Sequence, residues 1–103
     1  MTNNELFEIF SDYNNRNFCK GTSLPRNSLI KCHFLSLFGN DEVGNATPST
    51  INSVYDEMEA EGLRANTIFG EQSALYSYFR FAIEQGEMNE NPVSKARKVM
   101  REQ

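Results

Sequence analysis

Residues 63–92 constrain the fold of this chain most, because their apolar side chains recur at the spacing of one long helix. One side of that helix carries Ile68, Leu75, Phe79, Ala82 and Ile83. Aromatic side chains cover much of the remaining circumference, namely Phe69, Tyr76, Tyr78 and Phe81. A helix that is apolar on most sides is usually the central helix of a bundle. The pattern therefore predicts a central helix over about residues 67–85, capped by Asn66 or Thr67 and ended by Gly86.

The N-terminal residues predict a first amphipathic helix over about residues 4–17. Thr2 and Glu5 precede it with the spacing of a capping box, in which each side chain bonds the backbone of the other. Its apolar stripe consists of Leu6, Ile9, Phe10 and Tyr13. We expect this stripe to face the core.

A second helix is predicted over about residues 24–38. Thr22 or Ser23 can cap its start, because a hydroxyl can accept from the first free backbone amides. Its apolar stripe consists of Ile30, Phe34, Leu37 and Phe38. Gly39 and Asn40 are expected to end it, since both residues favour the left-handed conformation at a helix C-terminus.

A third helix, over about residues 48–61, begins at Thr47-Pro48 and ends at Gly62. Its inner stripe consists of Ile51, Val54, Tyr55 and Met58. Its outer face is acidic and is interpreted as a solvated surface, with Asp56, Glu57, Glu59 and Glu61. In the polar loop before this helix, the side chain of Val43 is expected to be buried in the core.

The remaining residues predict a short fifth helix that begins at Asn91-Pro92. Its apolar side carries Val93, Ala96 and Val99, and its other positions are basic. No segment shows the period-two alternation of a β-strand. The sequence therefore predicts an all-α fold, a compact bundle of four main helices plus a short C-terminal helix.

Composition sets further limits on the protein. A chain of 103 residues with 39% hydrophobic residues suits one folded domain. It has no apolar run long enough for a membrane span and no signal-peptide core at its N-terminus, so we expect a cytoplasmic location. Cys19 and Cys32 are interpreted as free thiols, with a disulfide as the less favoured alternative. With His33 they supply only three zinc ligands without a CxxC or HxxxH pair, so no metal or other cofactor is predicted.

The net charge of −4 is distributed unevenly along the chain. Residues 47–92 hold eight acids and two bases, whereas residues 93–103 hold four bases and one acid. Residues 1–46 are nearly balanced. A locally basic patch can bind phosphate even on an acidic protein, so the charge balance does not exclude nucleic acid as a partner.

Several segments together carry a family resemblance. They are LFEIFSDY, TSLPRNSLIKCHFLSLFG and EVGNATPSTINSVYDEMEAEGL, followed by the positions Thr67, Ile68, Leu75, Phe79, Phe81, Ala82, Gly86, Met88, Asn91 and Pro92. In this pattern the chain resembles the SAM-like core-binding domain at the N-terminus of tyrosine recombinases, the phage integrase family. The resemblance covers about residues 5–99. Glu71 departs from it, because family members often carry a base near that position.

The resemblance implies a domain that acts as one jaw of a clamp around duplex DNA. Catalysis in that family belongs to a second, C-terminal jaw, so this chain is not expected to be an enzyme by itself. Residues 1–92 would form the core-binding domain, and residues 93–103 a basic short helix or linker toward the absent catalytic domain. The chain would then be a fragment, whose partners are duplex DNA, the catalytic domain of the same polypeptide and, on DNA, further copies of itself.

The resemblance also implies which side chains contact DNA, since helices 2 and 4 of the family face the major groove. On helix 2 the candidates are Thr22, Ser23, Arg26, Asn27 and Lys31. Around the start and outer side of helix 4 they are Arg64, Asn66, Thr67, Ser73, Ser77 and Arg80. Hydroxyl and amide groups suit phosphate oxygens, and Arg can bridge the edge of a guanine. The candidates next to helix starts also suit a role as caps alone, and the charged ones also suit an ordinary surface.

Two alternatives to DNA binding follow from the same residues. The acidic balance and the aromatic residues of helix 4 also suit a helical protein–protein interaction module. An enzyme that uses Cys32 and His33 is disfavoured, because adjacent residues of a helix point about 100° apart; His33 is interpreted as a half-buried bystander. The four tyrosines lack an accompanying HxxR motif and are interpreted as core or surface aromatics.

Overall fold

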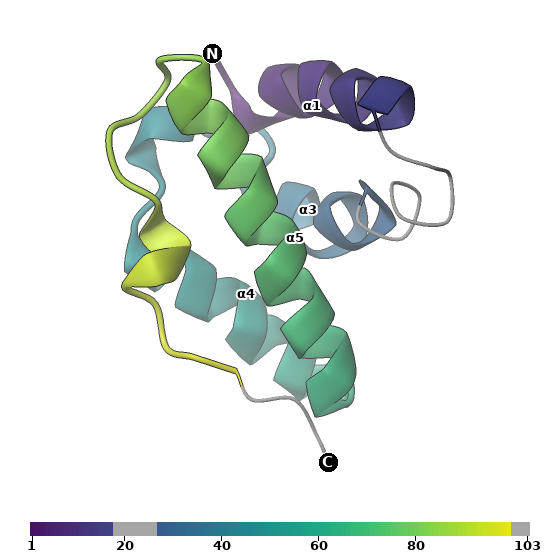
Figure 1. Cartoon of the computed structure of the whole chain (residues 1–103). Helices are drawn as coiled ribbons and strands as arrows, with labels where there is room; N and C mark the ends of the chain where they lie inside the picture. Colours follow the sequence, from purple (N-terminus) through teal and green to yellow (C-terminus); the bar gives the residue numbers. More distant parts are fainter. Residues whose placement is uncertain (18–26, 100–103) are drawn as a thin grey trace.

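The computed structural model describes residues 1–17 and 27–99 of the chain, and their regular structure is helical (Figure 1). The elements, in chain order, are α1 (Asn3–Asn17), the π-helical η1 (Ile30–Phe34), α3 (Leu35–Phe38), the 3-10 turn η2 (Val43–Asn45), α4 (Pro48–Ala60), α5 (Ala65–Glu84) and the 3-10 turn η3 (Pro92–Ser94). Within the described ranges the only β-type pairing is an isolated bridge between Thr2 and Glu42. The predicted all-α bundle is confirmed.

The central helix of the bundle is α5, as its apolar circumference predicted. In Figure 1 it lies between α1 and α3 on one side and η3 on the other. Its buried residues are Ile68, Glu71, Ala74, Leu75, Tyr78, Phe79, Phe81 and Ala82. The predicted start at Asn66 or Thr67 is wrong, because the helix begins at Ala65 with Arg64 as its N-cap residue and no side-chain cap. The backbone carbonyl of Arg64 already accepts from the amides of Thr67 and Ile68, at 3.0 and 3.1 Å.

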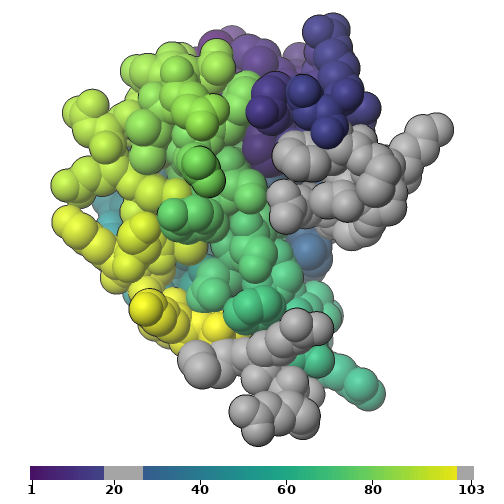
Figure 2. Space-filling view, viewed as in Figure 1, coloured from purple at the N-terminus to yellow at the C-terminus, as the bar shows by residue number. Residues whose placement is uncertain are grey.

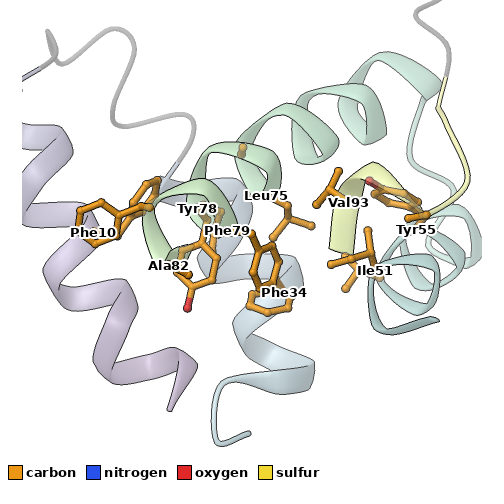
Figure 3. Packing of buried hydrophobic residues seen from close by; sticks show 14 of the residues in the cluster. Phe10, Phe34, Ile51, Tyr55, Leu75, Tyr78, Phe79, Ala82 and Val93 are labelled. Carbon is orange, nitrogen blue, oxygen red and sulfur yellow. The ribbon is translucent and has the colours of Figure 1, made fainter. Parts of the chain in front are cut away.

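Six aromatic rings of the described residues lie in the core together with aliphatic side chains (Figure 3). The ring centroids of Phe10 and Tyr78 lie 5.4 Å apart, edge to face, and those of Phe34 and Phe79 lie 5.6 Å apart. Tyr55 and other residues of α4 extend this cluster toward η3. Burial of each large apolar side chain contributes roughly 1.5–3 kcal/mol, so these rings and the aliphatic side chains around them are the main source of stability.

The predicted stripes of helices 1 and 2 each contain an error. Ile9 and Tyr13 are both 43% exposed, because α1 packs through a narrow ridge that instead buries Asn3, Leu6, Phe10 and Asn14. Leu37 is 46% exposed. The π-helical turn before it winds the chain less per residue than an α-helix does, which turns the buried face away from Leu37 and toward Leu35.

Most predicted helix ends are confirmed. Thr2 with Glu5, and Thr47 with Thr50, form capping boxes. Gly62 and Gly86 end α4 and α5 with φ values of 81° and 77°, which a residue with a side chain rarely adopts. The four inner residues of α4 and the loop residue Val43 are fully buried, as predicted.

Gly39 ends helix 2 for a reason other than the predicted left-handed conformation, since its φ is −59°. A Cβ atom at this position would collide with Oδ1 of Asn4 and would lie 2.6 Å from the carbonyl oxygen of Leu35. The carbonyl of Gly39 also accepts a hydrogen bond from the amide of Asn4, at 2.9 Å. Glycine is therefore required here by the close approach of α1.

In the part of the chain that is described, no helix combines the length and the apolar character needed to cross a membrane.

Candidate nucleic-acid interface

Four of the candidate side chains share the outer face of α5: Asn66, Ser73, Ser77 and Arg80. Their spacing of seven, four and three residues places them along one side of a helix. Asn66, Ser73 and Arg80 are exposed, and Ser77 is half-buried. Figure 2 shows α5 in the middle of this face of the molecule, between α1 and the C-terminal segment. The structure thus presents one polar stripe on the exposed side of α5, where Tyr76 and Glu84 are exposed as well.

A hollow of about 610 Å³ lies beside this stripe, between α5 and the C-terminal segment. Its lining residues are Gln72, Ser73, Tyr76, Ser77, Val93, Ser94 and Lys98. Three of them carry hydroxyl groups of serine, and Lys98 contributes the only charge. We call this the serine hollow. Its chemistry suits an anion that accepts hydrogen bonds.

A smaller hollow of about 210 Å³ continues the stripe toward α1. It is lined by Phe10, Tyr13, Asn14, Ser77, Arg80, Phe81 and Glu84. Ser77 belongs to both hollows, so they adjoin. The guanidinium of Arg80 lies 4.0 Å from the Glu84 carboxylate, and both side chains are largely exposed. Nδ2 of Asn14, which lines the hollow, donates to Oδ1 of the candidate Asn27 at 3.3 Å.

The other candidates lie elsewhere. Lys31 lines a separate hollow, together with residues of α1 and α3. Arg64 is exposed at the start of α5, and Thr67 is half-buried, about a third of a turn away from the polar stripe. Thr22, Ser23 and Arg26 fall outside the described residues. The structure therefore brings Ser73, Ser77 and Arg80 together around two hollows, but it places Lys31 in a separate hollow and Arg64 in neither.

The segment 92–99, which we call the strap, packs on α4 and α5. Val93, Ala96 and Val99 are buried on its inner side, as their spacing predicted. The amide of Arg97 donates to Oδ1 of Asn52 at 2.9 Å, and the amide of Val99 donates to Oε1 of Gln72 at 2.8 Å. The residues expected to start a linker are therefore part of the folded body as far as Val99.

The acidic face of α4 receives the side chain of Arg97. Its guanidinium lies 2.7 Å from Glu59 and 3.1 Å from Asp56, and 5.5 Å from the centre of the Tyr55 ring. These acids are exposed, as predicted, but two of them bind the strap and are not merely solvated. Lys95 pairs with Glu90 at 3.2 Å. Among the bases of residues 1–17 and 27–99, those without an ion pair are Lys31, Arg64 and Lys98.

Glu71 contributes little charge to this surface. Its side chain is fully buried, and neither carboxyl oxygen has a hydrogen-bond partner. Burial raises the pKa of Glu71 to about 8, so the carboxyl is mostly protonated at neutral pH. The Tyr55 hydroxyl is also without a partner, and burial, together with the charge of Glu71, raises the pKa of Tyr55. The departure of Glu71 from the family pattern therefore places an acid in the core, away from the exposed stripe.

Cys32 and His33 differ in their surroundings. Cys32 is exposed, and the half-buried His33 places Nδ1 3.9 Å from the carboxylate of Glu61. The prediction of a half-buried histidine is confirmed. The described ranges contain no group of three or more His, Cys, Asp or Glu residues able to hold a metal ion.

Sequence reasoning missed Lys98, Ser94 and Gln72 as site residues. The apolar spacing of Val93, Ala96 and Val99 was the available signal, because a packed segment fixes the side chains between its buried positions. Comparisons with protein-family models, with curated proteins and with solved structures found no match.

Proposed function

We propose that this chain binds duplex DNA through the outer face of α5, as the non-catalytic jaw of a clamp like that of tyrosine recombinases. The observation that carries the proposal is the row of polar side chains from Asn66 to Arg80 along the exposed side of α5, whose opposite side is buried in the core. Its length is about 21 Å at 1.5 Å per residue. That length can cross a major groove, which is roughly 12 Å wide, and reach phosphates on both sides.

Packing in the core holds α5, and with it the polar stripe, in place in the absence of DNA. Phe79 and Tyr78, on the buried side of α5, pack against rings of η1 and α1. A helix held in this way presents its hydroxyl, amide and guanidinium groups without a large loss of entropy on binding. In this proposal the cleavage and joining of DNA strands belong to a separate catalytic domain, and the protein acts in the cytoplasm.

The charges predict weak binding that depends on salt. The net charge is −4, and most described bases already pair with acids. A few phosphate contacts give a dissociation constant on the order of micromolar or weaker near physiological salt. Fluorescence anisotropy of a labelled duplex at about 50 mM and about 200 mM salt measures this. Binding that ignores ionic strength would contradict the proposal.

A matched pair of variants locates the interface. Arg80 and Arg16 are both exposed and both pair with an acid one helical turn away, but only Arg80 lies on the α5 stripe. We expect Arg80→Gln to weaken DNA binding several-fold and Arg16→Gln to have little effect. Equal effects of the two variants would show that long-range charge, and not the α5 face, governs the interaction.

A protein–protein interaction module is the second candidate, because several large apolar side chains are exposed. Tyr13 and Ile9 lie one turn apart on α1, and the ring of Tyr13 packs 5.2 Å from that of Phe81. Tyr76 is 47% exposed on α5. Light scattering coupled to size exclusion tests this candidate. A defined oligomer together with no retention on a DNA column would favour it over DNA binding.

A further inference from the structure

The three bases of the strap, Lys95, Arg97 and Lys98, differ in whether they form ion pairs. Lys95 pairs with Glu90, and Arg97 pairs with two acids of α4. Lys98, between Arg97 and Val99, has no ion pair and lines the serine hollow. One base of this segment is therefore available to an external anion.

Two hydrogen bonds hold the backbone on either side of Lys98. The amide before it, of Arg97, is bound by Asn52 on α4, and the amide after it, of Val99, is bound by Gln72 on α5. The Val99 side chain is buried as well. The root of the Lys98 side chain is thus fixed at the rim of the serine hollow, although its ammonium group stays exposed.

Both walls of the hollow supply hydroxyl groups. Ser73 and Ser77 lie one turn apart on α5, and Ser94 belongs to η3, in the same strap as Lys98. Tyr76 lies between the two serines of α5 in sequence and also lines the hollow. One ammonium group and several hydroxyl groups around a single hollow match the needs of a phosphate group, which accepts several charge-assisted hydrogen bonds.

We propose that the serine hollow is a phosphate-binding subsite and that Lys98 is its cation. Arg97 acts as a positioning residue, because its pairs with Asp56 and Glu59 hold the strap against the body. The subsite rests on the proposed function in that duplex DNA is the expected source of the phosphate. Free inorganic phosphate shares the same chemistry, so the two sources are tested separately.

The first test is an amide NMR titration of the whole 103-residue chain with inorganic phosphate. We expect saturable shifts confined to the lining of the hollow, including the amides of Ser73, Ser94 and Lys98. Lys98→Gln should weaken this binding about tenfold, because it removes one charge-assisted hydrogen bond. Lys95→Gln, which changes the charge equally at a paired base, should leave it unchanged.

The second test replaces phosphate by a duplex oligonucleotide and measures the dependence of affinity on salt. Lys98→Gln should lower the slope of log affinity against log salt by about 1, as expected for one lost phosphate contact. Lys95→Gln should keep the slope. Asp56→Asn with Glu59→Gln makes the protein less acidic and should nevertheless weaken binding, since Arg97 loses the partners that hold the strap.

The outcomes separate the subsite from the wider proposal. Phosphate binding that needs Lys98, without any binding of the duplex, would keep the subsite and overturn the DNA function. Duplex binding with an unchanged slope in Lys98→Gln, and no shifts with phosphate, would overturn the subsite and keep the DNA function. Tighter duplex binding by the Asp56→Asn, Glu59→Gln variant would refute the positioning role of Arg97.

Discussion

The hydroxyl of Tyr78, buried on α5, lies 2.9 Å from Oδ1 of Asn3 at the start of α1. Nδ2 of the same Asn3 side chain donates to the carbonyl of Phe38 at 3.0 Å. The backbone amide of Asn3 donates to the carbonyl of Asp41 at 2.9 Å. Asn3 is itself 1% exposed. One buried amide therefore joins three segments that are far apart in the sequence, and it sets the position of α1 against the central helix.

We expect Tyr78→Phe to destabilise the protein by about 1–3 kcal/mol, because Oδ1 of Asn3 then loses a buried donor. The free energy of unfolding in urea measures this. Tyr76→Phe is the matched control and should change stability by less than about 0.5 kcal/mol, since Tyr76 is exposed. A Tyr78→Phe protein as stable as the wild type would show that this hydrogen bond contributes nothing.

Glu71 should make the stability of the protein depend on pH. Burial raises the pKa of Glu71 from 4.5 to about 8 in the folded state. Folding therefore favours the protonated form, and this contribution is complete below about pH 4.5 and is lost as pH rises through about 8. We expect Glu71→Gln to be more stable than the wild type near pH 8, by an amount on the order of a few kcal/mol.

Urea unfolding of both proteins at about pH 5 and about pH 8 measures this effect. The advantage of Glu71→Gln should shrink at the lower pH. Glu57→Gln removes an exposed acid of α4 and should show no such dependence. If the difference between Glu71→Gln and the wild type were the same at both pH values, the buried carboxyl would have to be ionised throughout.

Substitution by alanine should have different effects on stability at Gly39 and at Gly70. Gly39→Ala should destabilise the protein by roughly 1–3 kcal/mol, because the new Cβ meets Asn4 and the backbone of Leu35. Gly70→Ala meets only the end of the flexible Leu29 side chain, at 3.3 Å. Its better helix propensity, up to about 1 kcal/mol, should offset that contact. Thermal unfolding of the two variants compares them, and equal losses would disagree with this account.

The helices could be predicted from the sequence because their signals are local. Caps such as Thr47 and stops such as Gly62 act within one turn, and apolar spacing identifies α5 as the central helix. The exposure of Leu37 could not be predicted in this way, since it follows from a π-helical turn that apolar spacing does not reveal.

The candidate site was less predictable, because its geometry depends on contacts between distant residues. Arg97 meets Glu59 across 38 positions of sequence, so the apolar spacing that predicts a short basic helix or linker does not reveal which acids hold it. A single sequence also does not show that the position of Glu71 on α5 is fully buried. The stripe of Ser73, Ser77 and Arg80 could be predicted from the sequence, since helical spacing alone places these residues on one face.

The separation of Lys31 from Arg80 gives a direct test of which surface meets DNA. Lys31 lines a hollow with α1 and α3, whereas Arg80 lies on the α5 stripe. We expect Arg80→Glu to weaken duplex binding by about tenfold or more, because it replaces a phosphate contact by a repulsive charge. Lys31→Glu carries the same change of charge and should weaken binding far less.

Anisotropy titrations at one salt concentration compare the variants, with circular dichroism to verify that both remain folded. A larger loss in Lys31→Glu would move the DNA surface from α5 to the face formed by η1 and α1.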